Sequence, residues 1–291
     1  MAAVDTHRLA ERGFAGAAPT IHRFCVTHKK PVLPESWYDD CISLGDFQPD
    51  SATHVRQLDQ FWHDARPIAY GAAGSNVLPV AIDRFCSAAK LIEISTYRKR
   101  ILPISLGIEC PLYQRALSLE NFEREAELSA FVPRADNEFL VAQPLYIEDS
   151  IIGQYAACHH RKDLLDYTSL AIETGVLDPN SASEFLATKH FIPGGIELGI
   201  YPKSWAVQTL TKIEVVGRQF LVRYGSRIKK YDDYQIRAIS FLSERLGSFF
   251  LVRHLMEKYS NNIPEGIFGY MTIIADEESS YFVGVTDPSG S

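Results

Sequence analysis

Apolar residues along the chain form short continuous runs that alternate with longer stretches of helical spacing. The run at 22–26 stops at the polar stretch THKKP, residues 27–31, which predicts a buried strand ending in a cationic loop. Residues 77–90 carry apolar side chains three and four positions apart, which predicts a helix with Asn76 as its N-cap. The apolar run at 91–95 predicts a second buried strand directly after that helix.

The same alternation continues along the rest of the chain. Helical spacing in two successive stripes covers 150–174 and stops before Gly175, a residue type that commonly ends helices. Further elements are predicted as strands at 129–132, 139–146 (interrupted at Pro144), 267–274 and 281–285, an extended glycine-bearing segment at 191–202, and long helices at 204–222 and 232–257. Strands interleaved with helices predict an α/β fold, in which a mostly parallel sheet is flanked by helices and ligands bind at the carboxyl ends of strands.

The pattern also suggests a domain organisation. Residues 1–20 lack a continuous apolar segment, so we expect a loosely ordered leader rather than a secretory signal. Residues 21–257 are predicted to form the main domain, and 258–291 a C-terminal extension with short strands and a polar tail. No stretch has the roughly 20 apolar residues that a membrane-spanning helix needs.

Composition narrows the class of protein. The chain has 291 residues, of which 46% are hydrophobic, and this is enough to build a substantial core. The formal net charge of −7 argues against a nucleic-acid-binding protein, which would usually be basic. The five cysteines are scattered without a Cys-x-x-Cys pair, so they support neither a zinc site nor a redox motif. A reducing cytoplasm is the simplest setting for such thiols.

Several common catalytic motifs are absent from the sequence. It contains no phosphate-binding GxxxxGK[ST] loop, no GxGxxG after the first strand, no GxSxG and no HExxH. These absences argue against P-loop kinases, dinucleotide enzymes, α/β-hydrolases and zinc proteases. The sequence also lacks Asp-x-Asp, the pair that commonly holds the metal ion in nucleotide-sugar transferases.

Three segments combine strand ends or helix starts with side chains suited to an anionic ligand. The THKKP stretch offers hydrogen-bond donors where the first strand would deliver them to a diphosphate. The two glycines of YGAAGSN, residues 70–76, allow close backbone approach at a helix start. In STYRKR, residues 95–100, Arg98 suits bidentate phosphate contacts and Tyr97 suits stacking on a base or sugar. The structural alternatives are a solvated turn, an ordinary helix start and a charged surface.

The segment 146–164 carries a candidate general base. Asp149 stands at a predicted helix start after a strand, a good position for activating a hydroxyl. Its structural alternative is helix capping by Asp149 or Ser150. His159 and Asp163 are four residues apart and share a face if the helix continues, although such pairs are often structural.

Two later segments place acidic residues in unusual surroundings. Glu197 lies in a glycine-bearing strand, where Gly194 and Gly195 would let a sugar lie against the backbone; a bulged strand is the structural alternative. Glu244 and Arg245 lie inside an apolar helix, where charged side chains must find partners or reach a cavity. We expect a structural role for this last pair.

The order of these motifs resembles a glycosyltransferase family found in bacterial capsule and O-antigen polysaccharide loci, long described only as a domain of unknown function. The resemblance spans 21–256 and rests on VTHKKP at 26–31, GSN at 74–76, TYRKR at 96–100, HHRKDL at 159–164, HFIPGGIELGIY at 190–201 and FLSERL at 241–246. It implies a GT-A-like (Rossmann-like) fold and the transfer of a hexose from a nucleotide-sugar donor, with UDP-hexose expected, to a glycan or lipid-linked acceptor. It further implies surface polysaccharide biosynthesis in the cytoplasm, at the inner face of the membrane and in peripheral association with an assembly complex.

The resemblance also implies roles for individual residues. Asp149 is the expected catalytic base, with Asp163 as its substitute. Substrate contacts are expected from Thr27, His28, Lys29, Ser75, Asn76, Tyr97, Arg98, His159, His160, Gly195 and Glu197. No residue is assigned to a metal. A requirement for a divalent cation, Mg²⁺ or Mn²⁺, stays open because arginine and lysine can supply the same electrostatic stabilisation.

Departures from the family pattern keep other functions open. Thr96 stands where the motif has histidine, Lys99 where it has a second arginine, and Ser75 where it has aspartate, and the asparagine of the late strand is absent. One alternative is a degenerate transferase that acts as a glycan-binding or scaffolding module. Another is an unrelated α/β nucleotide-binding enzyme. The sequence leaves open the sugar, the acceptor, the oligomeric state and whether transfer retains or inverts configuration.

Overall fold

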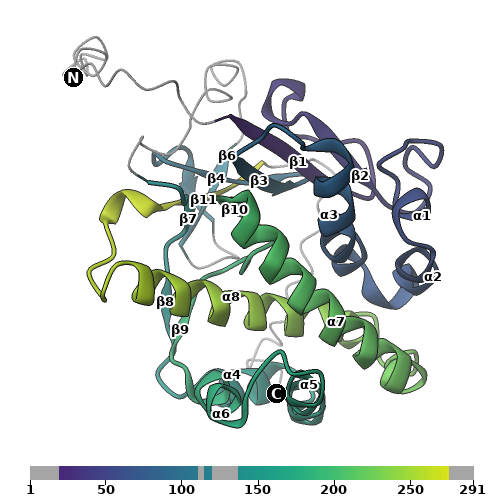
Figure 1. Ribbon diagram of the computed structural model, residues 1–291, viewed down its shortest axis with the longest axis vertical. Helices are drawn as coiled ribbons and strands as arrows, with labels where there is room; N and C mark the ends of the chain where they lie inside the picture. Colours follow the sequence, from purple (N-terminus) through teal and green to yellow (C-terminus); the bar gives the residue numbers. More distant parts are fainter. Residues whose placement is uncertain (1–19, 111–114, 120–136, 275–291) are drawn as a thin grey trace, which may run out of the picture.

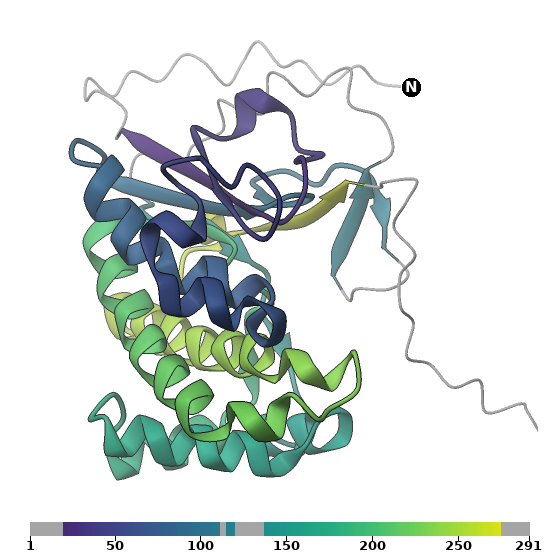
Figure 2. The same cartoon turned by 90° about the vertical axis from the view of Figure 1, so that its right-hand side faces the viewer.

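The computed structural model describes residues 20–110, 115–119 and 137–274. Its centre is a mixed sheet, and helices are stacked beneath one face of it (Figures 1 and 2). The predicted α/β fold is confirmed. The strands predicted at 129–132 and 281–285 lie outside the described residues.

The sheet is parallel around its first strand. β1 (Ile21–Thr27) pairs in parallel with β2 (Asp40–Ser43) on one side and β3 (Leu91–Thr96) on the other. The remaining described strands of the sheet are β4 (Lys99–Leu102) and β10 (Gly199–Pro202), both antiparallel to β3, then β11 (Phe268–Ile274), β6 (Ala116–Leu119), β7 (Val141–Ala142) and β5 (Ile108–Glu109). β11 pairs with β4, β6 and β7, so 268–274 is an integral part of this sheet although it falls in the predicted C-terminal extension.

The helices form successive layers beneath the sheet. α3 lies nearest to β1, α7 and α8 cross below it, and α4, α5 and α6 lie farthest from the sheet (Figure 2). Their bounds are α1 Val55–Leu58, α2 Gln60–Ala69, α3 Gly71–Phe85, α4 Ile151–Cys158, α5 Arg161–Glu173, α6 Pro179–Ala187, α7 Lys203–Ile228 and α8 Ala238–Lys258; short 3₁₀ turns are η2 Glu35–Trp37, η4 Gln235–Arg237 and η5 Glu265–Ile267. A separate ribbon of β8 (Leu145–Tyr146) and β9 (His190–Phe191) links the sheet to the lower helices.

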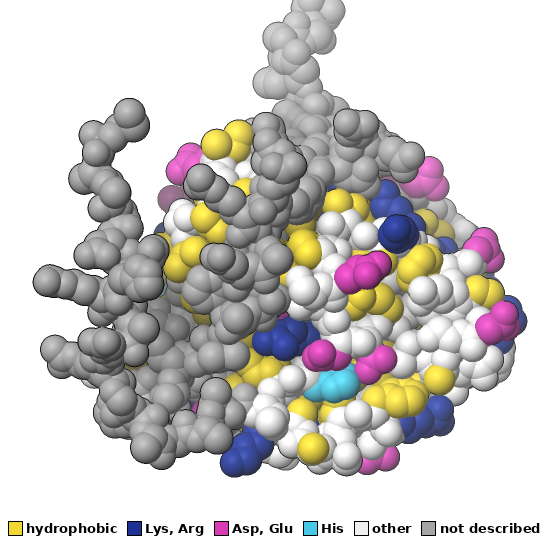
Figure 3. Space-filling view, turned by 90° about the horizontal axis from the view of Figure 1, so that it is seen from above, with side chains coloured by type: hydrophobic (Ala, Val, Ile, Leu, Met, Phe, Trp, Pro, Cys, Tyr) yellow, Lys and Arg dark blue, Asp and Glu magenta, His cyan; other side chains and the backbone are white. Residues whose placement is uncertain are grey.

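Both faces of the central strands are buried, which explains their continuous apolar runs. Phe24 and Ile92 face the helices in the larger core, whereas the neighbouring Cys25 faces a smaller cluster with Leu33 and Trp37. Successive side chains of a strand point to opposite faces, so two cores require apolar residues at nearly every position. Figure 3 shows the molecule from the side of the sheet that faces away from the stacked helices. Over the described residues, this surface mixes basic and acidic side chains without one large basic patch.

The second core also contains a buried ion pair. Arg100 is 1% exposed and Glu93 is 2% exposed, and the Nη2 of Arg100 donates to a carboxylate oxygen of Glu93 over 3.0 Å. Arg23 approaches the same carboxylate, and the guanidinium of Arg100 lies 4.8 Å from the centre of the Trp37 ring. Burying these charges is tolerated because each has an opposite partner. Arg100 is therefore separated from the rest of the predicted STYRKR cluster.

Two sequence-based boundaries were wrong. The helix predicted at 77–90 begins at Gly71, so the expected glycine loop and the Asn76 cap are both parts of α3. A Cβ on Gly74 would lie 2.4 Å from a methyl carbon of Val26, so the glycine lets α3 pack closely on β1. The helix predicted to run through His159 ends there, with His159 as the C-cap of α4 and His160 as the N-cap of α5.

Candidate functional site

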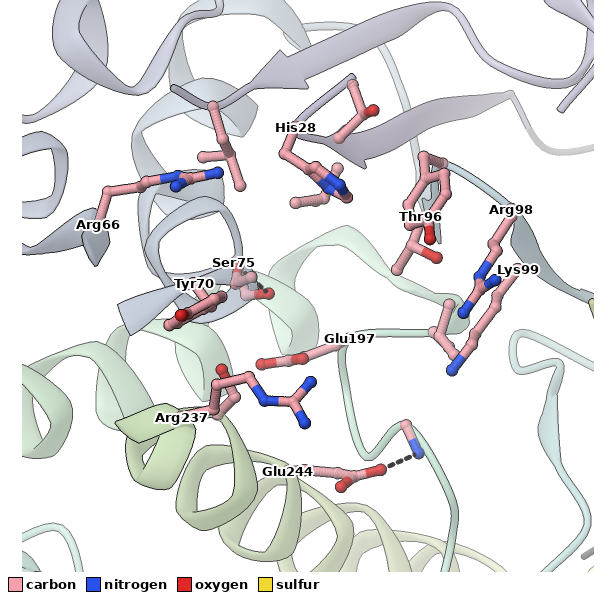
Figure 4. Close-up of a pocket in the computed structure, with 18 residues that line it drawn as sticks. His28, Arg66, Tyr70, Ser75, Thr96, Arg98, Lys99, Glu197, Arg237 and Glu244 are labelled. Atoms are coloured by element: carbon pink, nitrogen blue, oxygen red, sulfur yellow. Dashed lines mark hydrogen bonds between the residues drawn. The ribbon is translucent and has the colours of Figure 1, made fainter. Parts of the chain in front are cut away.

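A pocket of about 470 Å³ opens at the carboxyl ends of β1 and β3. The connection from β1 runs to β2 on one side of the sheet, and the chain then crosses to β3 on the other side. Such a change of direction is where open α/β sheets place their ligands. The lining residues, drawn in Figure 4, are Val26, Thr27, His28, Leu44, Arg66, Tyr70, Gly71, Ser75, Thr96, Tyr97, Arg98, Lys99, Gly194, Glu197, Leu198, Arg237, Ser240 and Glu244.

The end of β1 supplies the first wall of the pocket. The Thr27 hydroxyl accepts a hydrogen bond from the backbone N–H of Lys29 over 3.3 Å, which holds the chain in a tight turn directly after the strand. His28 follows and packs edge-on against Tyr97, with ring centres 4.9 Å apart. Lys29 also contacts this ring, with its Nζ 5.3 Å from the ring centre. The polar residues Thr27 and His28 after the first strand line the pocket, and their contact with a ligand stays a prediction.

The surroundings of His28 favour its neutral form. Burial lowers the pKa of the imidazole, and the positive charges of Arg66, Lys29 and Arg98 lower it further. A neutral imidazole can both donate and accept a hydrogen bond. An anionic ligand would offset the neighbouring positive charges and so raise this pKa.

The turn between β3 and β4 supplies the second wall. Backbone N–H groups of Val32 and Leu33 donate to the carbonyl of Tyr97, so the turn and the loop after β1 brace each other. Arg98 and Lys99 point into the pocket from this turn (Figure 4). The Arg98 guanidinium lies 5.3 Å from the centre of the Tyr97 ring, a cation–π contact that orients it.

The junction of α2 and α3 supplies the third wall. Tyr70 adopts φ 48° and ψ −126°, a backbone conformation that is costly for a tyrosine. It is held there because its N–H donates to the carbonyl of Arg66 and because Ser240 of α8 donates to the carbonyl of Ala69. Strain that persists beside a pocket is typical of functional positions. Ser75 lies one turn further along α3 and also faces the pocket.

The floor of the pocket comes from the loop before β10. Glu197 points into the pocket, between Ser75 and the side chain of Arg237 (Figure 4). Gly195 lies against α8, where a Cβ would come within 2.5 Å of the carbonyl oxygen of Glu244. This close approach requires glycine and brings the loop next to α8. Gly195 therefore packs on protein and does not line the pocket, whereas Gly194 does.

The start of α8 closes the pocket. Glu244 accepts a hydrogen bond from the backbone N–H of Gly194 over 2.7 Å. Arg237 stacks its guanidinium on the rings of Tyr234 and Phe241, at 5.0 and 5.5 Å from the ring centres. The expected Glu244–Arg245 structural pair is thus divided, because Arg245 turns away to bond Gln154 and the carbonyl of Phe241.

The pocket carries an excess of positive charge. Arg66, Arg98, Lys99 and Arg237 are cationic, whereas Glu197 and Glu244 are its acidic lining residues. The Nε atoms of Arg66 and Arg237 are buried and lack a hydrogen-bond partner among the residues that the structure describes. A buried donor without a partner is costly, so a ligand that supplies acceptors would bind favourably here.

The structure gathers part of the predicted site and leaves part of it elsewhere. The predicted substrate-binding residues that line the pocket are Thr27, His28, Ser75, Tyr97, Arg98 and Glu197. Lys29 is not a lining residue but contacts the ring of Tyr97. Asn76 faces α7, where its amide nitrogen lies near Gly217. The lining residues Arg66, Tyr70, Arg237 and Ser240 carried no separate sequence signal, apart from the position of Tyr70 beside the glycine stretch.

The predicted catalytic residues do not line the pocket. Asp149 is exposed before α4, and the helix is capped by Ser150, whose hydroxyl accepts from the N–H of Gly153. Asp163 is 1% exposed, and one of its carboxylate oxygens accepts hydrogen bonds from Arg227 over 2.6 Å and from Tyr231 over 3.1 Å. Ser150 therefore provides the helix cap that was the alternative for this segment, and Asp163 is held in a buried ion pair.

His159 and Asp163 do not share a helix face, because the helix is interrupted between them. His159 stacks on Phe241 with ring centres 4.2 Å apart, and burial lowers its pKa to about 4. His160 lies beside Tyr231 with ring centres 4.4 Å apart. The condition for a shared face, one continuous helix through both residues, is therefore not met.

The pocket residues do not fit a divalent-cation site built from protein ligands. The described part of the chain contains no cluster of three or more His, Cys, Asp or Glu side chains that could hold a metal ion. Arginine and lysine side chains supply positive charge on the pocket walls. The requirement for a divalent cation stays an open expectation, because Mg²⁺ is commonly held by one or two carboxylates together with substrate phosphates. Separately, none of the described helices has the length and apolar character needed to cross a membrane.

The fold is similar to that of a known protein. The apo structure of WbbM, described as a bifunctional glycosyltransferase, matches with a TM-score of 0.61 and 11% sequence identity. The match covers 88% of this chain but 46% of WbbM, so the chain spans less than half of that protein. No protein-family model matches the sequence, and no significant match was found among curated proteins. The expected glycosyltransferase-like fold is confirmed, whereas membership of the capsule and O-antigen family stays a prediction.

Proposed function

We propose that the chain is a glycosyltransferase that uses a nucleotide-sugar donor, with UDP-hexose as the expected donor. The observation that carries the proposal is the cationic pocket at the carboxyl ends of β1 and β3. A nucleotide sugar carries two negative charges on its diphosphate, and guanidinium groups match phosphate oxygens in both charge and geometry. The buried Nε atoms of Arg66 and Arg237 are donors that such a group would satisfy.

The fold and the motif order support the same activity. A chain that matches 46% of a bifunctional glycosyltransferase is what one transferase unit of a two-activity protein would give. The motif order favours a glycan or lipid-linked acceptor in surface polysaccharide biosynthesis. It also favours a cytoplasmic location at the inner face of the membrane, in peripheral association with an assembly complex.

In the proposed complex, residues at the carboxyl ends of β1 and β3 bind the diphosphate from two sides. His28 and the turn after β1 bind one side of it, and Arg98 binds the other. As the bond to the sugar breaks, negative charge grows on the diphosphate. The fixed cations of the pocket stabilise this charge without needing to rearrange, which is the main source of rate acceleration in many transfer enzymes.

The test is a binding panel of nucleoside diphosphates and their hexose conjugates, measured by titration calorimetry and by melting temperature. At a free ligand concentration 100 times the Kd, the preferred nucleotide should stabilise the fold by about 2.7 kcal/mol. We expect uridine nucleotides to bind best. If no nucleotide binds at millimolar concentration, the donor assignment is wrong.

A second candidate is a degenerate transferase that binds glycans without catalysis. It is favoured by one observation: Thr96 and Ser75, which replace the histidine and aspartate of the resembled motifs, both line the pocket. Hydrolysis of the bound nucleotide sugar distinguishes the two. An active transferase should release the nucleotide slowly with water as acceptor, whereas a binding module should not.

A further inference from the structure

We propose that Glu197 is the catalytic base of the transfer reaction and that Glu244 is a positioning residue that controls its protonation. The inference rests on the proposed function. It assigns the proton acceptor to a group inside the pocket, in place of Asp149 and Asp163, which lie outside it.

The backbone around Glu197 is fixed on both sides. On the N-terminal side, the N–H of Ile192 donates to the Ser248 hydroxyl over 2.7 Å. On the C-terminal side, the Tyr201 hydroxyl lies 2.6 Å from the carbonyl oxygen of Leu198 and 3.1 Å from that of Gly195. A side chain on so firmly held a loop is preorganised, which a catalytic group requires.

The surroundings of Glu197 make it a stronger base than an ordinary glutamate. Its pKa is raised to about 8, chiefly by burial and also by the charge of Glu244, while a hydrogen bond from Ser75 acts in the opposite direction. Tyr201 and Tyr167 interact electrostatically with Glu197, and their own pKa values are raised by burial, so both hydroxyls stay neutral. A carboxylate whose pKa lies near the working pH is well matched to proton abstraction.

Cations across the pocket complete this environment. Arg237 points toward the floor beside Glu197, and Arg66, Arg98 and Lys99 line the opposite walls together with the titratable but neutral His28 (Figure 4). Glu244 differs from Glu197 because it is engaged by the backbone N–H of Gly194. Of the two acidic lining residues, Glu197 is therefore the one placed to accept a proton.

The proposed step balances without a further reactant. The Glu197 carboxylate takes the proton of the acceptor hydroxyl, and the acceptor oxygen forms a bond to the anomeric carbon of the donor sugar. The bond between that carbon and the diphosphate oxygen breaks, and its electron pair leaves with the nucleoside diphosphate. Glu197 then releases its proton to solvent. Direct displacement of this kind inverts the configuration of the sugar.

The experiment uses the full chain with UDP and the UDP-hexose that binds best in the panel. It compares wild type with Glu197→Gln, Glu197→Asp and Glu244→Gln, and uses the exposed Glu184→Gln as the matched control. Calorimetry gives the affinity for UDP, and release of UDP with water as acceptor gives the turnover. Glu197→Gln should lower kcat by about 10²–10⁴-fold while the affinity for UDP changes less than about threefold. Glu197→Asp should recover part of the rate, and the control should behave as wild type.

The pH profile tests the role of Glu244. The base must be deprotonated, so kcat/KM of the wild type should rise with pH and level off above about 8, the pKa of Glu197. Glu244→Gln removes a negative charge and should move this rise to lower pH. A purely structural role for Glu244 would lower the rate without moving the profile, and would overturn its assignment.

Other outcomes separate this inference from the proposed function. If UDP binds but Glu197→Gln turns over at the wild-type rate, or if NMR of the first product shows retained configuration, the base assignment is wrong and the donor assignment stands. If UDP and UDP-hexoses do not bind, the base assignment and the donor assignment are both wrong. If the wild type binds UDP-hexose without turnover, the binding-module alternative is supported and the base assignment is overturned.

Discussion

Charged and polar side chains gather in two regions of the molecule, and the regions differ in what these groups contact. At the junction of α4 and α5, Asp163 is bonded by Arg227 and Tyr231, and His159 is stacked on Phe241. In the pocket, the Nε atoms of Arg66 and Arg237 find no acceptor within the described ranges. At the junction, Asp163 Oδ2 and Arg227 Nε also lack a hydrogen-bond partner among the described residues, but both side chains are held in ion pairs. The part of the chain that the structure describes gives Arg66 and Arg237 no ion pair, so an anionic ligand could engage their guanidinium groups. A charged motif alone does not identify a site, because the partners of its residues decide its role.

The two regions are nevertheless in contact. Phe241 and Tyr234 stack on His159 and also contact the Arg237 guanidinium. The junction therefore supports one of the cations that faces the pocket. Variants in the two regions should separate stability from ligand binding.

The largest effect is expected from Asp163→Ala. Removing one member of a buried ion pair typically costs 3–5 kcal/mol, and we expect about 3 kcal/mol because Arg227 keeps its second partner, Asp166. The free energy of unfolding measured in urea checks this value. UDP affinity of the folded variant should be unchanged. If Asp163→Ala were as stable as wild type but bound UDP weakly, the comparison of the two regions would be wrong. The junction of α4 and α5 would then belong to the UDP site.

A slightly smaller effect is expected from Arg98→Ala, and it should appear in UDP affinity rather than in stability. Loss of hydrogen bonds to a charged phosphate should weaken UDP binding by about 1.5–3 kcal/mol, with little change in stability. Arg98→Lys should recover only part of the affinity because the planar fork is lost. Lys230→Ala removes an exposed cation outside the pocket and serves as the matched control. Equal affinities in all four proteins would show that Arg98 is only a surface charge.

The smallest effect concerns the strained residue Tyr70. Alanine and glycine substitutions both remove the ring, so they should change UDP affinity equally. At φ 48° and ψ −126°, however, glycine is far less strained than alanine. Tyr70→Gly should therefore be more stable than Tyr70→Ala by about 1 kcal/mol, as measured in urea. Equal stability of the two variants would mean that the pocket stores no strain at this position.

Much of the fold could be predicted because β1 and β3 are buried on both faces. Their continuous apolar runs are a local signal, and the polar residues after them mark the edge where ligands bind. The start of α3 was missed because Gly71 and Gly74 have low helix propensity. Packing of Gly74 on Val26 outweighs that propensity, and such a tertiary contact leaves no trace in a short window of sequence.

The site was harder to predict than the fold, for a related reason. Ser75 and Arg98 were found because they lie next to strand ends or helix starts. The environment of Glu197 depends on Glu244, which belongs to another element and approaches through the glycine contact with α8. A carboxylate on an exposed helix start, such as Asp149, looks the same in sequence as one in a pocket. Only the folded chain distinguishes them.

The assembly of the pocket from distant segments has a consequence for folding. Arg98 comes from the first half of the chain, whereas Glu197, Arg237 and Glu244 come from the second. These segments meet only after long loops have closed, and contacts of this kind form slowly because closure costs entropy. Nucleotide binding would then report when the last step of folding, the docking of α8 and its loop against the sheet, is complete. A fluorescent nucleotide added during refolding should report that step separately from the earlier formation of helices.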